Sequence, residues 1–341
     1  MNIRDIARIA NVTPGTVSKV INNYPDIGDA TRQKVLKVIE EYQYTPVKGP
    51  NSPTFQNRKS QIAIVNEGVN NVLHSFIEEV LSIRLHNGDY TTFFYHDNYF
   101  VQPKPEKFQE LLRYAENHNL AGLVYLGGNF ADLPLSCFDK LPCSTVFVNT
   151  MLPEGAAFTR FSQVSCNHYD TGYNQMKQII AAGHREIGIL ITSQGDNSVY
   201  SLRLRGYRMA LAEHQLESQL SNIIEGHYTA LKTYENVLDF LKRNPRTTAI
   251  CCSADVMVPA ALRAITDFGA IPGQDIALIS FDGLELMPYL TPSIATYQQP
   301  AEDMITSIYD ILLGTMEGSM SHMGITYETK FIPGESFPVS K

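Results

Sequence analysis

Cysteine is scarce in this sequence of 341 residues. Only five cysteines occur, two of them adjacent as Cys251 and Cys252, and none has CxxC spacing. This usage argues against a disulfide framework and favours reduced thiols. No apolar run reaches the ~18 residues that a membrane helix needs, and the first residues lack the apolar stretch of a secretory signal. We therefore expect a cytoplasmic protein with no membrane segment.

Motifs for catalysis, nucleotide binding and metal binding are also missing. The sequence contains no GxxxxGK[ST], GxGxxG, GxSxG or HExxH pattern. Its nine histidines show no paired spacing suited to metal ligands. The pair Gly127-Gly128 follows an apolar run and is more typical of a turn than of a phosphate-binding loop. We expect no enzymatic activity, no cofactor and no metal.

The composition is that of a folded protein with an uneven charge distribution. Hydrophobic residues make up 44% and charged residues 18%, and at roughly 100–200 residues per domain the length suggests two or three domains. The net charge is -8, yet residues 1–60 carry nine Lys or Arg against five Asp or Glu. Residues 61–341 therefore carry -12. A small basic head on an acidic body indicates a nucleic-acid-binding module joined to another domain, with DNA contacting only the head.

The head, residues 1–46, has the pattern of three short helices. Apolar residues recur at helical spacing over 3–10. Thr13 suits an N-cap and begins a second helix over 14–22, in which proline stands at the first helical position. A third helix is predicted over about 29–42. This pattern fits a helix-turn-helix whose second helix enters the major groove; it also fits a small helical cap on a larger enzyme.

The head contains the run IARIANVTPGTVSKVIN at 6–22 and a second characteristic stretch within 31–46. In these residues it resembles the lactose/galactose-repressor (LacI/GalR) family of bacterial transcriptional regulators. The resemblance implies that Pro14, Gly15 and Lys19 occupy base-reading positions. It implies phosphate contacts for Thr16, Ser18, Asn22, Thr31 and Tyr44. Because the family usually has arginine where Lys19 stands, bidentate recognition of guanine is weakened here.

The linker, residues 47–60, matches the family poorly. Family members follow the head with a short hinge helix whose leucine inserts into the minor groove. Here Pro53 stands near the position of that leucine, and Pro50 and Gly49 disfavour a helix. We expect an extended tether that bends DNA little, with Phe55 as an alternative wedge.

The body, residues 61–341, alternates short apolar runs with amphipathic stretches. Strands are predicted at 62–65, 92–95, 120–126, 145–148, 187–191, 248–252 and 276–280, and helices at 72–86, 172–182, 202–214, 234–243 and 257–268. Alternating strands and helices imply parallel sheets, and their number implies two lobes. Ligands of such folds bind at the carboxyl ends of the strands, here between the lobes.

The family resemblance extends over the body to about Phe337 and implies a two-lobed fold similar to periplasmic sugar-binding proteins. It is carried by stretches such as AGHREI at 182–187, RLRGY at 203–207 and SFDG at 280–283. It implies three strands crossing between the lobes, with one lobe at about 61–161 plus 293–323. The other lobe is then at about 162–292 plus 324–341.

The resemblance also implies effector-binding residues. Arg203 occupies the position of an arginine that grips hydroxyls or carboxylates with its planar fork. Asp282 matches an acceptor of sugar hydroxyl groups, and Tyr228 matches an aromatic that stacks on a sugar face. Asn149 and Gln299 complete the predicted set.

Several positions near the predicted effector site depart from the family pattern. The usual Ala-Asn-Asp triplet reads Ser253-Ala254-Asp255, and the usual Asp-Asn pair reads Asn167-His168. Residues 70–73 stand roughly where the family usually has an Asn-Pro-Phe-Phe loop after the first strand, and their sequence differs from it. These departures leave the identity of the effector open.

Two functions fit these patterns. The first is a homodimeric transcriptional regulator, expected to be a repressor, that binds a near-palindromic DNA operator and is controlled by a small-molecule effector, expected to be a sugar. The second is a cytoplasmic small-molecule-binding protein or sugar hydrolase with a vestigial DNA-binding head. DNA binding that weakens when Arg4, Lys19 and Arg32 are neutralised would distinguish the first from the second.

Overall fold

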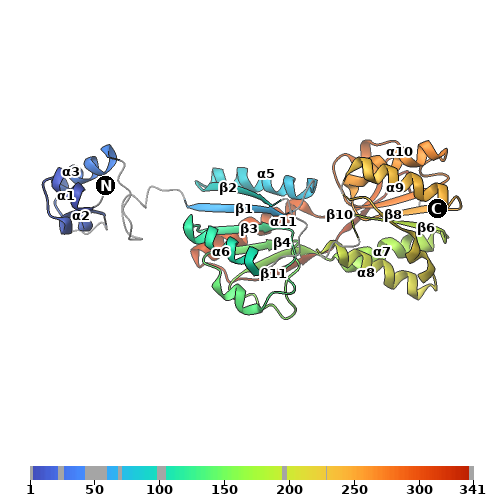
Figure 1. Ribbon diagram of the computed structural model, residues 1–341, viewed down its shortest axis with the longest axis horizontal. Helices are drawn as coiled ribbons and strands as arrows, with labels where there is room; N and C mark the ends of the chain where they lie inside the picture. The colour runs from blue at the N-terminus through green and yellow to red at the C-terminus, as the bar shows by residue number, and fades with distance from the viewer. Residues whose placement is uncertain are drawn as a thin grey trace. The chain divides into compact units, whose positions relative to one another are not determined.

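The computed structural model describes residues 3–21, 27–42, 60–67, 71–97, 105–193, 198–227 and 229–337. The chain divides into two compact units, Met1–Ser60 and Gln61–Lys341 (Figure 1). The predictions for Asn22, Tyr44 and Tyr228, and for the linker up to residue 59, lie outside the described residues. Within the described ranges, no helix has both the length and the apolar character to cross a membrane.

The first unit contains the three predicted helices, α1 (Ile3–Ile9), α2 (Pro14–Ile21) and α3 (Asp29–Glu41). As predicted, α2 begins with proline, and the Thr13 hydroxyl caps it by accepting a hydrogen bond of 3.1 Å from the backbone N–H of Thr16. The turn between α1 and α2 places Asn11 at φ 48°, a left-handed conformation that asparagine tolerates. The core is formed by residues from all three helices: Ile6, Ala7, Ala10, Val17, Val20, Val35, Val38 and Ile39.

The second unit contains two lobes, each built on a six-stranded sheet. In the first lobe the strand order is β11-β5-β4-β3-β1-β2, and every neighbouring pair is parallel. The strands are β1 (Gln61–Glu67), β2 (Thr91–Asp97), β3 (Gly122–Leu126), β4 (Ser144–Val148), β5 (Ser162–Cys166) and β11 (Gly324–Tyr327). Helices α5 (Val72–Asn87) and α11 (Ala301–Glu317) contribute to the core on one face, and α6 (Pro105–Asn117) covers the other.

The second lobe has the strand order β12-β10-β9-β8-β6-β7, parallel except for the antiparallel pair of β10 and β12. Its strands are β6 (Ile187–Ile191), β7 (Ile223–Glu225), β8 (Ala249–Cys252), β9 (Ala277–Asp282), β10 (Ala295–Gln298) and β12 (Lys330–Ile332). Helices α7 (His168–Ala181) and α8 (Tyr200–Glu213) pack on one face, and α9 (Ala230–Arg243) and α10 (Val258–Phe268) on the other. Because both faces are covered, every residue of β6 and β8 is buried, which explains their continuous apolar runs.

The chain crosses between the lobes three times, after β5, after β10 and after β11. The predicted lobe boundaries are wrong at each crossing, because β5 and β11 belong to the first sheet and β10 to the second. Strand pairing explains the difference. Ile325 of β11 pairs with Val164 of β5, which extends the first sheet, whereas Tyr297 of β10 pairs with Phe281 of β9 in the second.

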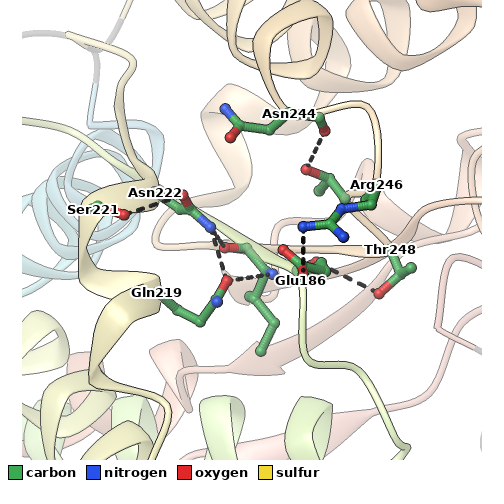
Figure 2. A network of polar contacts seen from close by, with 9 residues as sticks. Glu186, Gln219, Ser221, Asn222, Asn244, Arg246 and Thr248 are labelled. Atoms are coloured by element: carbon green, nitrogen blue, oxygen red, sulfur yellow. Dashed lines mark hydrogen bonds and ion pairs between the residues drawn. The ribbon is translucent and has the colours of Figure 1, made fainter.

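A network of hydrogen bonds and an ion pair lies at the amino ends of β6 and β8 (Figure 2). The backbone N–H of Ile187 donates to Gln219 at 3.1 Å, and the Asn222 amide donates to the Ile187 carbonyl at 3.2 Å. Arg246 and Glu186 form an ion pair at 3.6 Å between exposed side chains. These contacts satisfy backbone groups at the sheet end opposite the carboxyl edge, so we assign the network a structural role.

Helices α7 and α8 pack unusually closely at two glycines. A Cβ on Gly206 would overlap the backbone of Tyr169 and Tyr173, and a Cβ on Gly172 would overlap the backbone of Arg203. The approach therefore fixes the backbone of Arg203 relative to α7.

We expect Gly206→Ala to lower the free energy of unfolding by about 3 kcal/mol, because rigid backbone has to move. At the control position, Gly318, an added Cβ would have no neighbour within 4 Å and the backbone φ is 74°. Gly318→Ala should therefore lower the free energy of unfolding by about 1 kcal/mol through backbone strain alone. Urea unfolding measures both values. Equal losses in the two variants would contradict close helix packing.

Candidate functional site

In the first unit, the N-terminal part of α2 presents an exposed surface. Pro14, Gly15 and Lys19 are exposed, and Thr16 is partly exposed. Ser18 lies in α2, and Thr31, at the start of α3, is partly exposed. Several predicted DNA-contact residues therefore share one short helix whose opposite side, Val17 and Val20, is buried in the core. Such an exposed helix has the form that major-groove recognition requires.

In the second unit, five polar residues form one continuous chain of hydrogen bonds. Arg203 Nη1 lies 2.9 Å from His168 Nδ1, and His168 Nε2 lies 3.1 Å from Asn149 Oδ1. Asn149 Nδ2 donates to Gln299 Oε1 at 3.1 Å, and Gln299 Nε2 donates to Asp282 Oδ1 at 2.9 Å. We call this set the polar chain. It begins at a guanidinium and ends at a carboxylate.

The donor and acceptor roles in the polar chain all run in one direction. Arginine can only donate, so His168 Nδ1 must carry the lone pair and its Nε2 must carry the proton. That proton is donated to Asn149 Oδ1, which also accepts from the backbone N–H of Cys166 at 3.1 Å. The Asn149 oxygen is thereby fixed, and its amide nitrogen faces Gln299. Hydrogen bonds aligned in this way strengthen one another in a low-dielectric interior.

Two of the three middle residues of the polar chain lie at the connections between the lobes. Asn149 follows β4, His168 begins α7 after the first crossing, and Gln299 follows β10 at the second crossing. All three are almost fully buried, with exposed fractions of 1%, 1% and 3%. The two ends, Arg203 and Asp282, come from α8 and from the carboxyl end of β9. The polar chain therefore joins the carboxyl edge of the second sheet to two of the crossings.

Burial sets the protonation of this site. Desolvation holds the pKa of His168 well below its usual value, and the nearby Arg203 cation lowers it further. Desolvation raises the pKa of Asp282, against the opposing effect of Arg203 and of the hydrogen bond from Gln299. Desolvation also raises the pKa of Asp255, next to Asp282. Asp255 accepts from the backbone N–H groups of Gly283 and Leu284, each at 2.8 Å, and so holds the turn after β9.

Arg203 is enclosed by aromatic rings. Its guanidinium carbon lies 4.5 Å from the ring centre of Tyr200 and 4.1 Å from that of Phe281, and the residue is 0% exposed. The backbone at Asp282 adopts a φ of 121°, which an L-residue rarely occupies. Backbone strain of this kind is often found at ligand sites, where the surrounding contacts hold it in place.

The structure brings together four of the predicted effector residues, Arg203, Asp282, Asn149 and Gln299. Both polar atoms of the Asn149 and Gln299 amides are engaged within the polar chain. Sequence reasoning missed His168 as a site residue, although its departure from the family pattern was the signal that could have identified it.

His74 is a second buried histidine that sequence reasoning missed. It lies in the first turn of α5 and is 1% exposed, and neither ring nitrogen has a partner among the described residues. Burial lowers its pKa to about 4. The preceding turn contacts the second lobe, because the Asn71 amide donates to the Tyr200 hydroxyl. Across the described ranges, no group of three or more His, Cys, Asp or Glu is arranged to hold a metal ion.

The site and fold define a protein with a helix-turn-helix head and a two-lobed binding body. Comparison with protein families agrees with this description: residues 2–47 match the model of bacterial regulatory proteins of the lacI family, and residues 176–337 match a periplasmic binding protein-like domain. The HTH-type transcriptional regulator MalR of Clostridium butyricum is 30% identical over 342 residues, covering 98% of this chain and 99% of the relative. The chain therefore belongs to the lacI family and is a transcriptional regulator of the helix-turn-helix type.

Other relatives and solved structures agree with this assignment. The PurR repressor of Aliivibrio salmonicida (strain LFI1238) is 26% identical, covering 91% of each chain. Among solved structures, the CelR–cellobiose complex aligns with a TM-score of 0.67 at 23% identity, covering 98% of this chain and 99% of the other. The Lac repressor dimer bound to operator and the anti-inducer ONPF aligns at 0.70 and 20%, covering 98% of each chain. At these identities the structures support the fold alone.

The low pKa of His74 predicts a pH-dependent stability. Below its usual pKa of 6.5 the unfolded state takes up a proton that the folded state does not bind until about pH 4, so stability falls as the pH drops through this range. Relative to wild type, His74→Leu should gain about 2 kcal/mol in free energy of unfolding between pH 8 and pH 5. The control Ile77→Val, on the same helix, should differ from wild type by a constant amount. A pH-independent difference for His74→Leu would contradict a buried neutral imidazole.

Proposed function

We propose that this protein is a homodimeric repressor that binds a near-palindromic operator through α2. A small polyhydroxylated effector that binds between the lobes lowers or raises the affinity for this operator. The polar chain is the observation that carries this proposal, because it links a buried arginine and a carboxylate to the connections between lobes. The function is regulatory and non-catalytic, and we place it in the cytoplasm, where its DNA target lies. Residues 1–46 are assigned to DNA binding, 47–60 to a tether, and 61–341 to effector binding.

The names of similar proteins support a metabolite as effector. They include MalR, PurR and the ribose operon repressor of Haemophilus influenzae, and one similar structure is a complex with cellobiose. Carboxylate, arginine and aromatic side chains are the usual contacts for hydroxylated ligands. We assign Arg203 and Asp282 to direct effector contact. Tyr228 is assigned the stacking role expected from the sequence.

The mechanism follows from the position of the polar chain. An effector that engages Arg203 and Asp282 changes the energy of the hydrogen bonds to His168 and Gln299, which stand at two of the crossings. The effector therefore favours one arrangement of the lobes over another. Only this difference in its affinity for the two arrangements can change the affinity of the protein for DNA. Asn149, which joins both crossings, acts as a positioning residue in this proposal.

For DNA recognition, we propose base contacts by Pro14, Gly15 and Lys19. The phosphate contacts are proposed for Thr16, Ser18, Asn22, Thr31 and Tyr44. Proline and glycine offer no side-chain hydrogen bonds, so Lys19 supplies the polar part of base reading in this set.

Lys19→Ala should weaken binding to the region upstream of the protein's own gene by roughly tenfold or more, with a smaller loss on unrelated DNA, because a base contact is worth about 1–3 kcal/mol of discrimination. Fluorescence anisotropy at several salt concentrations measures both affinities. The matched control is Lys232→Ala, an exposed lysine of α9 that pairs with Glu235 at 2.9 Å, and it should bind as wild type does. Unchanged discrimination in Lys19→Ala would contradict the proposed role. Absence of specific binding together with turnover of sugar substrates would instead support a hydrolase with a vestigial head.

A further inference from the structure

We infer that the effector is a hydroxylated carboxylic acid of the sugar type, a uronic or aldonic acid, whose carboxylate binds the Nε and Nη2 edge of Arg203. This inference rests on the proposed function, since it names the chemical class of the ligand at the same site. The inference depends on which nitrogen atoms of the Arg203 guanidinium already form hydrogen bonds within the protein.

Arg203 has one hydrogen-bonding edge left for a ligand. The guanidinium carbon lies over two aromatic rings, those of Tyr200 and Phe281. Nη1 donates to His168 at 2.9 Å. Nε and Nη2 are buried and have no hydrogen-bond partner in the described part of the chain. These two nitrogens share an edge of the planar group, and their parallel N–H bonds match an acceptor that has two oxygens side by side.

The charge of Arg203 favours a carboxylate over a pair of hydroxyls. Arg203 is 0% exposed and forms no ion pair with any described acidic residue. The neighbour on Nη1, His168, is neutral, because its Nδ1 accepts and its pKa is lowered. A buried cation needs a nearby opposite charge. A vicinal diol would offer the two N–H groups neutral acceptors, whereas a carboxylate accepts both in charge-assisted hydrogen bonds.

The carboxylates of the protein near this site limit how much negative charge a ligand can carry. Asp282 uses Oδ1 to accept from Gln299, and Asp255 is engaged with the turn that follows β9. Asp282 lies near the arginine, so a doubly charged phosphate would meet stronger repulsion from it than a single carboxylate would. The planar shape and single charge of a carboxylate match the single charge of Arg203.

His168 determines this specificity by positioning Arg203. It occupies Nη1, holds the guanidinium against Phe281, and leaves the Nε and Nη2 edge for the ligand. The ring of His168 lies 5.6 Å from that of Phe281, so it belongs to the same packed cluster. The hydroxyl groups of the ligand are then available to Asp282.

The test compares matched ligands on the full-length wild-type protein. Isothermal titration calorimetry and thermal shift are measured with D-galacturonate, D-glucuronate and D-gluconate against D-galactose, D-glucose and glucose 6-phosphate. We expect at least one acid to bind tenfold or more tightly than its neutral counterpart and to raise the melting temperature. Arg203→Lys keeps the charge and loses the two-nitrogen edge, so it should remove most of this preference. Arg205→Lys, an exposed position on the same helix, should retain it.

A neutral sugar that binds as tightly as its acid, a response to glucose 6-phosphate alone, or no stabilisation by any of the acids would each overturn the inference. The wild-type comparison decides the question even if Arg203→Lys fails to fold. A neutral sugar that changes DNA affinity would refute the carboxylate and leave the proposed function standing. An acid that binds without changing DNA affinity would support the carboxylate and refute the proposed regulation.

Discussion

The hydrogen bond from Arg203 to His168 is the interaction on which the organisation of the body depends. It places a permanent cation beside an imidazole that must stay neutral, in an interior where neither group is hydrated. A protonated imidazole could not accept this bond and would repel the guanidinium. The bond therefore fixes the tautomer of His168, and through it the orientations of Asn149 and Gln299. The hydrogen bonds run in one donor direction from Arg203 to the carboxylate of Asp282.

The fold supplies the precision that this bond requires. Two glycines let α7 and α8 approach until the backbone of Arg203 touches that of Gly172. Parallel strands bring the carboxyl ends of β4 and β9 and the crossings after β5 and β10 to the same region of the molecule. Two of the central residues of the polar chain, His168 and Gln299, lie at connections between the lobes, so the polar chain joins these connections to Arg203 and Asp282.

Much of the fold could be predicted from the sequence, because central strands such as β6 and β8 are buried on both faces and lie in the apolar runs 187–191 and 248–252. The start of α2 was also predictable, since Thr13 and Pro14 are strong local signals. The lobe boundaries were not, because β10 and β11 are short and their sheet is decided by pairing with distant strands.

The candidate site was predictable only in part. Arg203 and Asp282 could be named from the family pattern, but that pattern carries no information on a residue that departs from it. His168 and His74 acquire their properties from burial and from partners far away in sequence, which no local spacing reveals. Asn149 was named from its position after a strand, and the structure adds that its amide is engaged within the polar chain.

The protonation of His168 is the most direct measurement of the central claim. Long-range ¹H–¹⁵N spectra of the ¹⁵N-histidine-labelled protein, with His168→Gln to assign the signals, report the state of each ring nitrogen. We expect a protonated Nε2 and an unprotonated Nδ1, both unchanged from pH 8 to pH 5. A proton on Nδ1, or titration near the ordinary histidine pKa, would contradict the hydrogen bond from Arg203 and the polar chain built on it.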